Sequence, residues 1–568
     1  MQDKRYLPRN KRWLAFFILA ALVLLLWSWF RISISISPPP VADRSADTLT
    51  VRCLPGGESR CGQSWLKKDT SGLWLMYLKG NPYERGVANG KLAKTLIYWQ
   101  EKAFVDQIRK MIPSDFYLRF LKYFIYWFNR DLDKYVSLET RQEIYGISNS
   151  ANPEFAFIGS NYQRMLNYHS AHDIGHALQQ LSLVGCTSFG AWGNSTNDGS
   201  LIVGRNFDFY MGDEFARNKI ICFEQPDTGH AFMMVTWGGM TGAVSGMNEE
   251  GLTVTINAAR SKIPFSARMP ISLLAREILQ YASDIDQAYA IAGKRLTFIS
   301  ESLLIGSDKD GRAAIIEKSP YHTTLFESKG TSILCANHFQ SPEFASDPMN
   351  IENIRENASS YRFRRLQEDI CRESPLTVAK AASILRDREG LNGADIGMGN
   401  EKAMNQLIAH HSVIFSPSKR LVWVSTGPWQ LGAFKCFDLR KIFHNFAAPG
   451  KGVEIDDNVK DIPPDTFLES AGYRAYIEFG AMRKILHECI NQGRALPVES
   501  SFIPEFIHTN PRYYESWFLV AEYYFMRKDP ERARSYYYRA LGCEVPRWNE
   551  KQKIISRIAE CNMGSKKY

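Results

Sequence analysis

The hydrophobic pattern changes character several times along the chain, and each change marks a predicted region. An uncharged apolar run occupies 13–30, and apolar residues recur at helical spacing from 72 to about 183. From Gly185 the pattern becomes short β-rich segments separated by Gly and Asn, with helices returning between them. Residues 467–568 are again helical in pattern and rich in aromatic side chains. These alternations predict an α+β protein whose β-rich core carries helices on its outer faces.

Composition shifts divide the chain into predicted regions. A Ser- and Pro-rich stretch separates the N-terminal apolar run from the helical region that follows, and it is predicted to be a linker. The predicted regions are a basic tip with an anchor (1–31), a linker (32–71), a helical region (72–185), a β-rich core (186–430), a connector (431–464) and a helical tail (465–568).

The N-terminal apolar run is just long enough to cross a bilayer as a helix. Five basic residues precede it, and tryptophans stand at both of its ends, where the membrane interfaces would lie. By the positive-inside rule this is a single-pass membrane protein with a cytoplasmic N-terminus, and the rest of the chain lies outside the cytosol. The alternative is a cleaved signal peptide. The length of the run, with no small-x-small site before Pro38, favours the anchor.

The β-rich core opens with a predicted hairpin that gathers three chemically active side chains. Its turn is the loop-forming stretch 194–200. Folding the flanking strands about Asn197 brings Cys186 opposite Asp208, and Arg205 then lies one step away. The two strands are predicted at 187–192 and 201–209.

A thiol beside a fixed cation is the arrangement that lowers a cysteine pKa and makes the sulfur nucleophilic. The alternatives are structural, because cysteine is common in protein cores and Arg205 and Asp208 could pair only with each other. Burying either charge without a partner costs on the order of several kcal/mol. Their position in an otherwise apolar segment beside Cys186 therefore favours a functional site.

Three polar residues further along the chain are candidates for the same site. Asn257 and Asn337 each end a predicted core strand, where an asparagine is usually a turn residue. At the ends of two core strands, their amides could instead donate N–H groups to an oxyanion. Arg362 begins a basic predicted helix and by itself would be a solvated residue.

The bulk composition excludes several other classes. The 45% hydrophobic and 23% charged residues are those of a folded protein, and 568 residues allow more than one domain. The net charge of +9 is mild and no long basic run lies outside the N-terminus, so no nucleic-acid partner is predicted. No C-x-x-C pair occurs among the ten cysteines, and neither a metal nor another cofactor is predicted. Cys53 and Cys61 could form a disulfide in an oxidising compartment.

The hairpin and the later motifs resemble the N-terminal nucleophile hydrolases. The branch concerned holds choloylglycine hydrolases, acid ceramidase, N-acylethanolamine acid amidase and the penicillin acyltransferases. The resemblance covers roughly residues 72–430. It is carried by Cys-Thr-Ser at 186–188, Gly-Arg-Asn-Phe-Asp-Phe at 204–209, the segment 246–258, Ala-Asn-His-Phe at 336–339, Ser-x-Arg-Phe at 360–363 and the earlier segment 80–92.

This resemblance implies a four-layer αββα sandwich and a precursor that activates itself. Cys186 would attack the carbonyl of Gly185 and cut the chain there, which makes 72–185 a propeptide and 186–430 the catalytic core. Gly185 has no side chain to hinder the attack. The new N-terminal residue would supply the nucleophilic thiol and, through its α-amine, a base that titrates near neutral pH.

The resemblance also implies roles for the other candidate residues. Asp208 orients the new amine, and Arg205 steadies the thiolate and the region of the substrate carbonyl. Asn257 and Asn337 take the oxyanion and amine-positioning roles. Arg362 is the best match for the late arginine of the family.

The chain departs from the family pattern at several points. The turn after Cys186 is longer than in most relatives. Position 258 is Ala where the ceramidase branch carries an acidic residue, which argues against ceramidase activity. Arg364 and Arg365 lie close enough in sequence to compete for the role of Arg362. The anchor and the helical tail are additions to the family core.

The helical tail contains the pattern of one tetratricopeptide repeat. Because a solenoid repeat needs neighbours to bury its faces, a single repeat either packs against the main domain or binds a protein partner, and both remain open. The matching positions are Trp517, Ala521, Tyr524, Ala533, Tyr537 and Ala540, with Pro546 one residue late.

The sequence thus predicts an autoprocessing N-terminal cysteine hydrolase that cleaves a linear, non-peptide amide through an acyl-thioester. The predicted small-molecule substrate is N-acyl or lipid-like. Trp237, Met240 and Met247 are candidates to line its pocket, although each is also an ordinary core residue type. Two alternatives stay open. One is an acyltransferase that passes the acyl group to an amine. The other is an inert membrane-tethered scaffold whose tail binds a partner.

Overall fold

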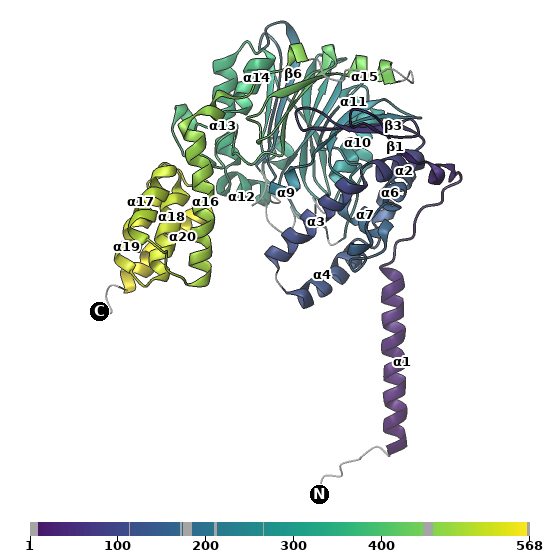
Figure 1. Cartoon of the computed structure of the whole chain (residues 1–568), viewed down its shortest axis with the longest axis horizontal. Coiled ribbons are helices and arrows are strands. Elements are labelled where there is room, and N and C mark those ends of the chain that lie inside the picture. The colour runs from purple at the N-terminus through teal and green to yellow at the C-terminus, as the bar shows by residue number, and fades with distance from the viewer. Residues whose placement is uncertain are drawn as a thin grey trace.

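Two β-sheets form the centre of the protein, and helices surround them (Figure 1). Each sheet contributes side chains to a shared hydrophobic core, so the sheets pack face to face. The computed structural model describes residues 9–112, 114–170, 173, 185–209, 213–264, 266–446 and 458–564.

The larger sheet joins strands from before and after Gly185. In spatial order its strands are β1 Val51–Cys53, β2 Ser59–Cys61, β3 Ser64–Lys68, β4 Trp74–Gly80, β7 Ile220–Pro226, β8 Phe232–Thr236, β9 Ser245–Asn248, β10 Leu252–Ala258, β11 Glu301–Ser307, β12 Arg312–Lys318 and β13 Thr323–Glu327. β4 and β7 are parallel, with Trp74 beside Ile220, and the other neighbours are antiparallel.

The smaller sheet is antiparallel and contains the predicted hairpin. In spatial order its strands are β14 Ser332–Cys335, β5 Thr187–Gly193, β6 Gly199–Phe207, β15 His411–Ser416, β16 Leu421–Ser425 and β17 Phe434–Asp438. β5 and β6 pair as the hairpin, and β14 and β15 flank it on either side.

The helices fall into three groups along the chain. Those before Gly185 are α1 Arg9–Ser33, α2 Pro82–Leu92, α3 Lys94–Met111, α4 Asp115–Phe128, α5 Leu132–Tyr135, α6 Leu138–Ser148 and α7 Asn161–His169. Those of the core are α9 Asp213–Ala216, α10 Ile271–Tyr281, α11 Ile285–Lys294, α12 Pro348–Glu356, α13 Ser359–Glu373, α14 Val378–Leu385 and α15 Leu439–Phe446. Those of the tail are α16 Ala471–Gln492, α17 Glu499–Thr509, α18 Tyr514–Met526, α19 Pro530–Leu541 and α20 Trp548–Gly564.

Alternation along the strands assigns one face of each sheet to the shared core and the other to helices. In β10, Val254 and Ile256 belong to the core beneath α10, whereas Asn257 contacts Ser188 of the smaller sheet. The outer face of the larger sheet packs on α10, and that of the smaller sheet packs on α13 and α14. The predicted mixed α+β class is therefore confirmed.

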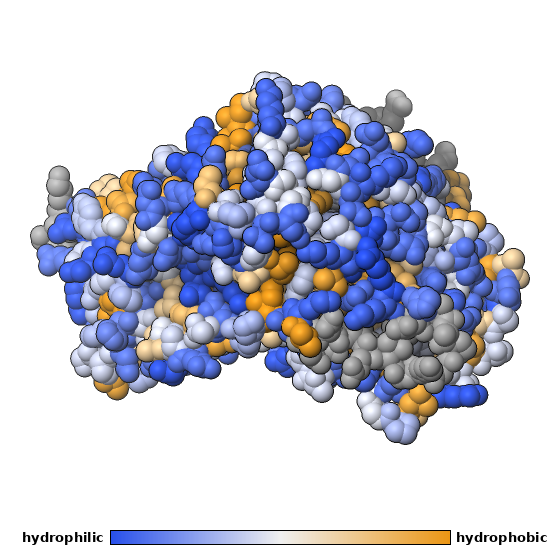
Figure 2. Space-filling view, turned by 90° about the horizontal axis from the view of Figure 1, so that it is seen from above, coloured by the Kyte–Doolittle hydropathy of each residue, from blue (hydrophilic) through white to orange (hydrophobic). Residues whose placement is uncertain are grey.

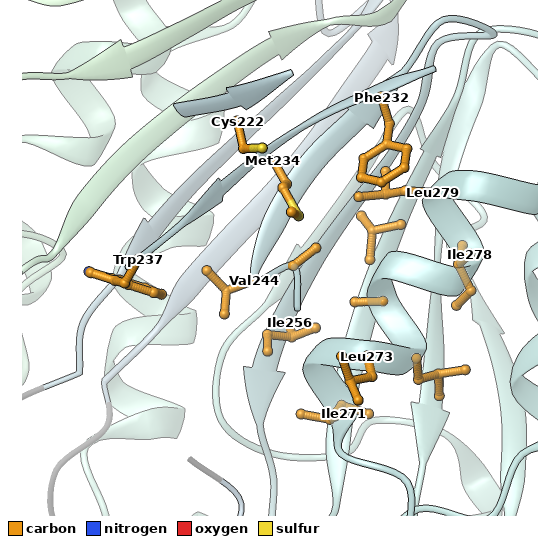
Figure 3. Close-up of a cluster of buried hydrophobic side chains, with 14 of the residues drawn as sticks. Cys222, Phe232, Met234, Trp237, Val244, Ile256, Ile271, Leu273, Ile278 and Leu279 are labelled. Atoms are coloured by element: carbon orange, nitrogen blue, oxygen red, sulfur yellow. The ribbon is translucent and has the colours of Figure 1, made fainter. Parts of the chain in front are cut away.

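Helix α10 covers the larger sheet because its apolar residues recur every three or four positions. Ile271, Leu274 and Ile278 recur at this spacing and are buried in the same core as Phe232 and Ile256. Figure 3 shows Ile271 and Ile278 of the helix with Phe232 and Ile256 of the sheet. This packing fixes the position of β10, whose last residues carry the first candidate asparagine.

The N-terminal apolar run forms α1. Among the described residues, its stretch Trp13–Ser33 is the one helix that is long and apolar enough to cross a membrane. The end of α1 packs on α4, because the ring of Phe30 stacks on Trp127 at 5.7 Å between centroids and Trp27 meets Tyr123 at 5.5 Å.

Three regional predictions need correction. The expected linker 32–71 contains β1, β2 and β3, and β4 begins the region expected to be helical. These short strands give a weak local pattern and are held by pairing with one another and, through β4, with β7. The expected connector 431–464 contains α15 and β17, which pairs with β16. Cys53 and Cys61 are free thiols rather than a disulfide.

The last part of the region predicted to be helical contains α7, and residues 171, 172 and 174–184 lie outside the described residues. The tail has its own hydrophobic core and also contacts the segment 398–401, which precedes β15. Met398 and Asn510 exchange hydrogen bonds of 3.1 and 2.9 Å, and Arg547 pairs with Glu401 at 2.5 Å. The identity of the tail as a tetratricopeptide repeat stays a prediction.

Candidate active site

The hairpin brings the predicted trio together. β5 begins directly after Cys186, and β6 ends directly before Asp208. Ser188 pairs with Arg205 across the hairpin, and the Gly185 N–H donates to the main-chain oxygen of Asp208 at 3.0 Å. The β5–β6 hairpin therefore brings the thiol, the guanidinium and the carboxylate into one region, as the sequence predicts.

The register of the hairpin differs from the prediction by one residue. Cys186 lies opposite Phe207, whereas the sequence predicts that it lies opposite Asp208. Gly193 and Gly199 close the turn, which is therefore centred one residue before the predicted Asn197, and a bulge beside Gly193 shifts the register again. Bulges of this kind leave no clear signal in a strand pattern.

Cys186 is buried beside a cation. Its Sγ lies 3.8 Å from Arg205 Nη2 and 3.7 Å from the main-chain oxygen of Asp208, and the residue is 1% exposed. Burial raises the pKa of the Cys186 thiol to about 11, and the charge of Arg205 lowers this pKa only in part. The predicted lowering of the thiol pKa is thus wrong for the intact chain, because lost hydration outweighs the cation.

Arg205 is held rigidly by hydrogen bonds. Nη1 donates to the Val244 oxygen at 2.7 Å and to Ser245 Oγ at 2.5 Å, and Nη2 donates to the Ile256 oxygen. The guanidinium also lies over the ring of Phe207, 4.4 Å from its centroid. A guanidinium fixed on these sides presents its charge to the thiol in a constant geometry.

The Asp208 carboxylate is fully buried, and within the described part of the chain neither oxygen has a hydrogen-bond partner. No ion pair joins Asp208 to Arg205 among those residues, so the structural alternative in which the two charges pair with each other does not hold there. Burial raises the pKa of Asp208 to about 7, although Arg362 and Arg205 favour its charged form. A buried carboxylate without a donor costs free energy and is chemically incomplete.

The two candidate asparagines reach the site from strand ends of different sheets. Asn257 Oδ1 accepts from Ser188 Oγ at 3.0 Å, and its amide donates to the Cys335 oxygen at 3.3 Å. The Asn337 amide donates to the Ala258 oxygen at 3.0 Å. Each side-chain amide carries two N–H groups, so one N–H of each asparagine is not used in these hydrogen bonds.

Arg362, on α13, connects the second asparagine to the hairpin. Its Nη2 donates to Asn337 Oδ1, its Nε donates to Thr187 Oγ1 at 3.3 Å, and its Nη1 donates to the Glu401 oxygen at 2.8 Å. The side chain is buried and orients the asparagine amide through its oxygen.

The two neighbouring arginines, which compete for the role of Arg362 in sequence, lie elsewhere. Arg365 pairs with Asp387 at 2.8 Å, and the guanidinium of Arg364 lies over the ring of Tyr361 at 5.9 Å. Arg362 is therefore the arginine of this helix that reaches the hairpin.

Gln406 is a site residue that sequence reasoning missed. It precedes β15, is 2% exposed, and donates from Nε2 to the carbonyl oxygen of Gly185 at 2.8 Å. A Cβ built at Gly185 would overlap this amide and come within 2.7 Å of its carbon, so the pair fits only with glycine. Gln406 lies in no motif and is 221 positions from Gly185, so no sequence signal could have found it.

A buried pair behind Arg205 was also missed. Ser245 Oγ accepts from Arg205 and lies 2.9 Å from His411 Nε2. Burial holds the pKa of His411 well below its usual range, so its ring is neutral and can accept the Ser245 hydroxyl hydrogen. These two residues orient the guanidinium.

The predicted pocket residues separate into two cores. Trp237 and Met240 pack in the core that contains Cys186, whereas Met247 is buried between the two sheets. The role of these three residues in lining a pocket stays a prediction. Within the described ranges, no group of three or more His, Cys, Asp or Glu side chains is placed to hold a metal ion.

Parts of the chain are similar to known proteins. The family model described as acyl-coenzyme A:6-aminopenicillanic acid acyl-transferase matches residues 195–428, which is less than half of the chain and begins after Cys186. An uncharacterized protein of Archaeoglobus fulgidus is 26% identical over 317 residues, covering 49% of this chain and 52% of the relative. The N-acylethanolamine-hydrolyzing acid amidase of Caenorhabditis elegans is 24% identical over 226 residues, covering 38% of this chain and 59% of the relative.

Solved structures give a weaker likeness. The Caenorhabditis elegans amidase ortholog has a TM-score of 0.31 at 14% identity, covering 41% of this chain and 93% of that one. A conjugated bile acid hydrolase variant from Clostridium perfringens has a TM-score of 0.32 at 12% identity, covering 45% of this chain and 93% of that one. These scores carry no inference. The chain spans between half and three fifths of the curated relatives named above. Over part of its length, the chain is thus similar to an acyl-transferase family model and to an acid amidase.

Proposed function

We propose that this chain is an autoprocessing N-terminal cysteine hydrolase that acts on a linear, non-peptide amide. The observation that carries the proposal is the convergence at Gly185-Cys186: Sγ lies 3.8 Å from a fixed guanidinium, and a buried amide holds the carbonyl that Sγ would attack. The two facing sheets with helices outside support the αββα sandwich that such enzymes use.

Maturation begins with the Cys186 thiol. Sγ bonds to the Gly185 carbonyl carbon, the carbonyl electrons move to oxygen, and collapse breaks the bond from that carbon to the Cys186 nitrogen. The thiol proton ends on that nitrogen, which leaves an amine and a thioester. Water then hydrolyses the thioester to the Gly185 carboxylate and a free thiol.

Cleavage supplies an amine that the site of the intact chain lacks. The new α-amine of Cys186 is a donor beside Asp208, whose two oxygens have no partner among the described residues of the intact chain. Asp208 then orients the amine, which takes the thiol proton as the thiolate attacks the substrate carbonyl. Asn257 and Asn337 donate their remaining N–H groups to the oxyanion or the amine.

A hydrophobic N-acyl substrate fits both the relative and the surroundings of Cys186. The Caenorhabditis elegans relative is named as an N-acylethanolamine-hydrolyzing acid amidase. Trp237 and Met240 lie in the apolar core that contains Cys186. Water attack on the acyl-thioester gives hydrolysis, and amine attack gives acyl transfer; the match to an acyl-transferase model keeps the second outcome open.

Attachment to a membrane through α1 is part of the proposal. The helix packs on α4, which exposes an aromatic stripe, with Phe116 84%, Phe120 64% and Phe124 54% exposed. The face turned away from α1 is largely hydrophilic, with separate hydrophobic patches (Figure 2). Both features support a bilayer on the α1 side. The basic residues that precede α1 support an N-terminus in the cytosol, with the two sheets outside it.

The test uses the full-length chain in membranes or detergent. Mass spectrometry of the purified wild-type protein is expected to find a fragment that begins at Cys186, and Cys186→Ala is expected to remain one inactive chain. Products formed from N-acyl amides, with and without an added amine, separate hydrolysis from transfer. A Cys186→Ala protein that stays intact and still turns over substrate contradicts the proposal. An uncut, inactive wild type favours the scaffold alternative.

A further inference from the structure

Gln406 contacts the one carbonyl that autoprocessing must attack, and no role has been assigned to it. Its Nε2–H donates to the Gly185 oxygen at 2.8 Å. Gln406 is 2% exposed, so this donor acts away from bulk water, where hydrogen bonds to developing charge are strong. We propose that Gln406 is a catalytic residue of the self-cleavage step, donating to the oxyanion that forms on Gly185. This inference rests on the proposed autoprocessing.

The chemistry of the step requires a donor at this oxygen. When Sγ bonds to the Gly185 carbon, the carbonyl oxygen takes the electron pair and becomes negative. A donor already placed on that oxygen stabilises the charge without reorganising, which is how oxyanion holes act. Asn257 and Asn337 are proposed to serve the substrate oxyanion or the new amine, and their amides donate to the Cys335 and Ala258 oxygens. Gln406, in contrast, donates directly to the Gly185 oxygen.

The backbone around Gln406 holds its side chain in place. Leu407, the next residue, has a left-handed backbone at φ 53°, and its N–H donates to Asn405 Oδ1 at 2.9 Å. Asn405 in turn donates its main-chain N–H to the Asp387 oxygen at 2.7 Å. A non-glycine residue in this conformation is held by its surroundings, as is common where a side chain must be aimed.

The segment 401–406 is also held at its N-terminal end, where two of its residues form ion pairs with the tail. Glu401 binds Arg547 of the tail through its carboxylate and Arg362 through its main-chain oxygen. Lys402 pairs with Glu544 of the tail. The loop that carries the cleavage donor is thus tied to the tail and to α13.

The test compares cleavage rates of full-length variants made by cell-free translation into lipid nanodiscs. Appearance of the fragment that begins at Cys186 is followed over time at several pH values. Gln406→Met keeps the approximate size of the side chain but has no donor, and it is expected to slow cleavage by about 10²–10³-fold. Gln430→Met is the matched control, because Gln430 is also fully buried and its amide donates to the Leu385 oxygen at 3.4 Å rather than to Gly185. It is expected to cleave at the wild-type rate.

Gln406→Glu supplies a second readout that loss of structure would not mimic. Its carboxyl regains an O–H donor when protonated, so its rate relative to wild type is expected to rise as pH falls. Gln406→Met cleaving as fast as wild type, or a Gln406→Glu ratio that does not change with pH, would overturn the inference while leaving autoprocessing intact. A wild-type chain that is never cut would overturn the proposed function instead.

Discussion

Four buried charges join the parts of the chain that lie on either side of Gly185. Arg85 and Glu143 precede it, and Glu224 and Arg276 follow it. Arg276 lies 2.7 Å from Glu143 and 2.5 Å from Glu224. Arg85 lies 3.0 and 2.8 Å from the same two carboxylates. None of the four side chains is more than 2% exposed.

Replacing Arg276 with Met leaves two buried carboxylates facing one arginine, a net charge of −1 (+1 − 2) where these four groups now sum to zero. Removing one partner of a buried ion pair costs about 3–5 kcal/mol, and Arg276 serves two carboxylates. Burial raises the pKa of Glu224 to about 7 even with both arginines present. The free energy of unfolding is therefore expected to fall by about 3–5 kcal/mol at pH 8, and by less at pH 5, where a carboxyl takes up a proton.

The assay is urea unfolding followed by tryptophan fluorescence, in the Cys186→Ala background so that the chain stays intact. Arg217→Met is the control, because it breaks an exposed ion pair with Glu214, with side chains 67% and 62% exposed, and should change nothing measurable. In cleaved wild-type protein, residues 1–185 are expected to stay bound, and Arg276→Met should release them at lower urea. A loss below about 1 kcal/mol at pH 8, or one that does not depend on pH, would refute the reasoning.

Three further predictions follow from the site and the surface. At pH values above 7, Asp208→Asn in the Cys186→Ala chain is expected to increase the free energy of unfolding. The gain should shrink toward pH 4, because the raised pKa of Asp208 lets the folded chain keep a proton that the unfolded chain loses; a gain independent of pH in urea titrations would contradict this. Asn257→Ala in the cleaved enzyme is expected to lower kcat by about 10²–10³-fold with little change in KM, and an unchanged kcat would remove it from the oxyanion site. A photo-cross-linking phenylalanine analogue at Phe120 is expected to label phospholipid in nanodiscs, and one at Tyr538 of the tail is not; adducts to a second copy from Phe120 would instead indicate a protein interface.

The trio of the hairpin could be predicted because it depends on local structure. Cys186, Arg205 and Asp208 lie on two strands joined by a short turn, so strand and turn propensities bring them together even with a register error of one residue. Asn257 and Asn337 depend on the packing of one sheet on the other, and their selection needed the resemblance to a family. Nothing local distinguishes them from turn residues.

The remaining site features depend on tertiary burial, which periodicity does not encode. The cation beside Cys186 could be read from the sequence, but the loss of hydration that raises the thiol pKa could not. Gln406 reaches Gly185 through a loop whose course is set by hydrogen bonds to distant residues and by the tail. The strands β1–β4 were missed for a similar reason, since pairing in the larger sheet stabilises them more than their own propensity does.

In the intact chain, the charged and titratable groups of the site lack a partner that the proposed mechanism requires. The thiol has a raised pKa, and the carboxylate that should orient a base has no donor within the described residues. In the proposed maturation both conditions change when one bond breaks, because a cut after Gly185 would create an amine on Cys186, beside the thiol and Asp208. A cationic amine lowers the pKa of a neighbouring carboxyl and of a neighbouring thiol. Under the proposed function, charge therefore sets the order of events. Cleavage would rely on donors such as Gln406 that are in place beforehand, whereas turnover would use the amine that cleavage makes.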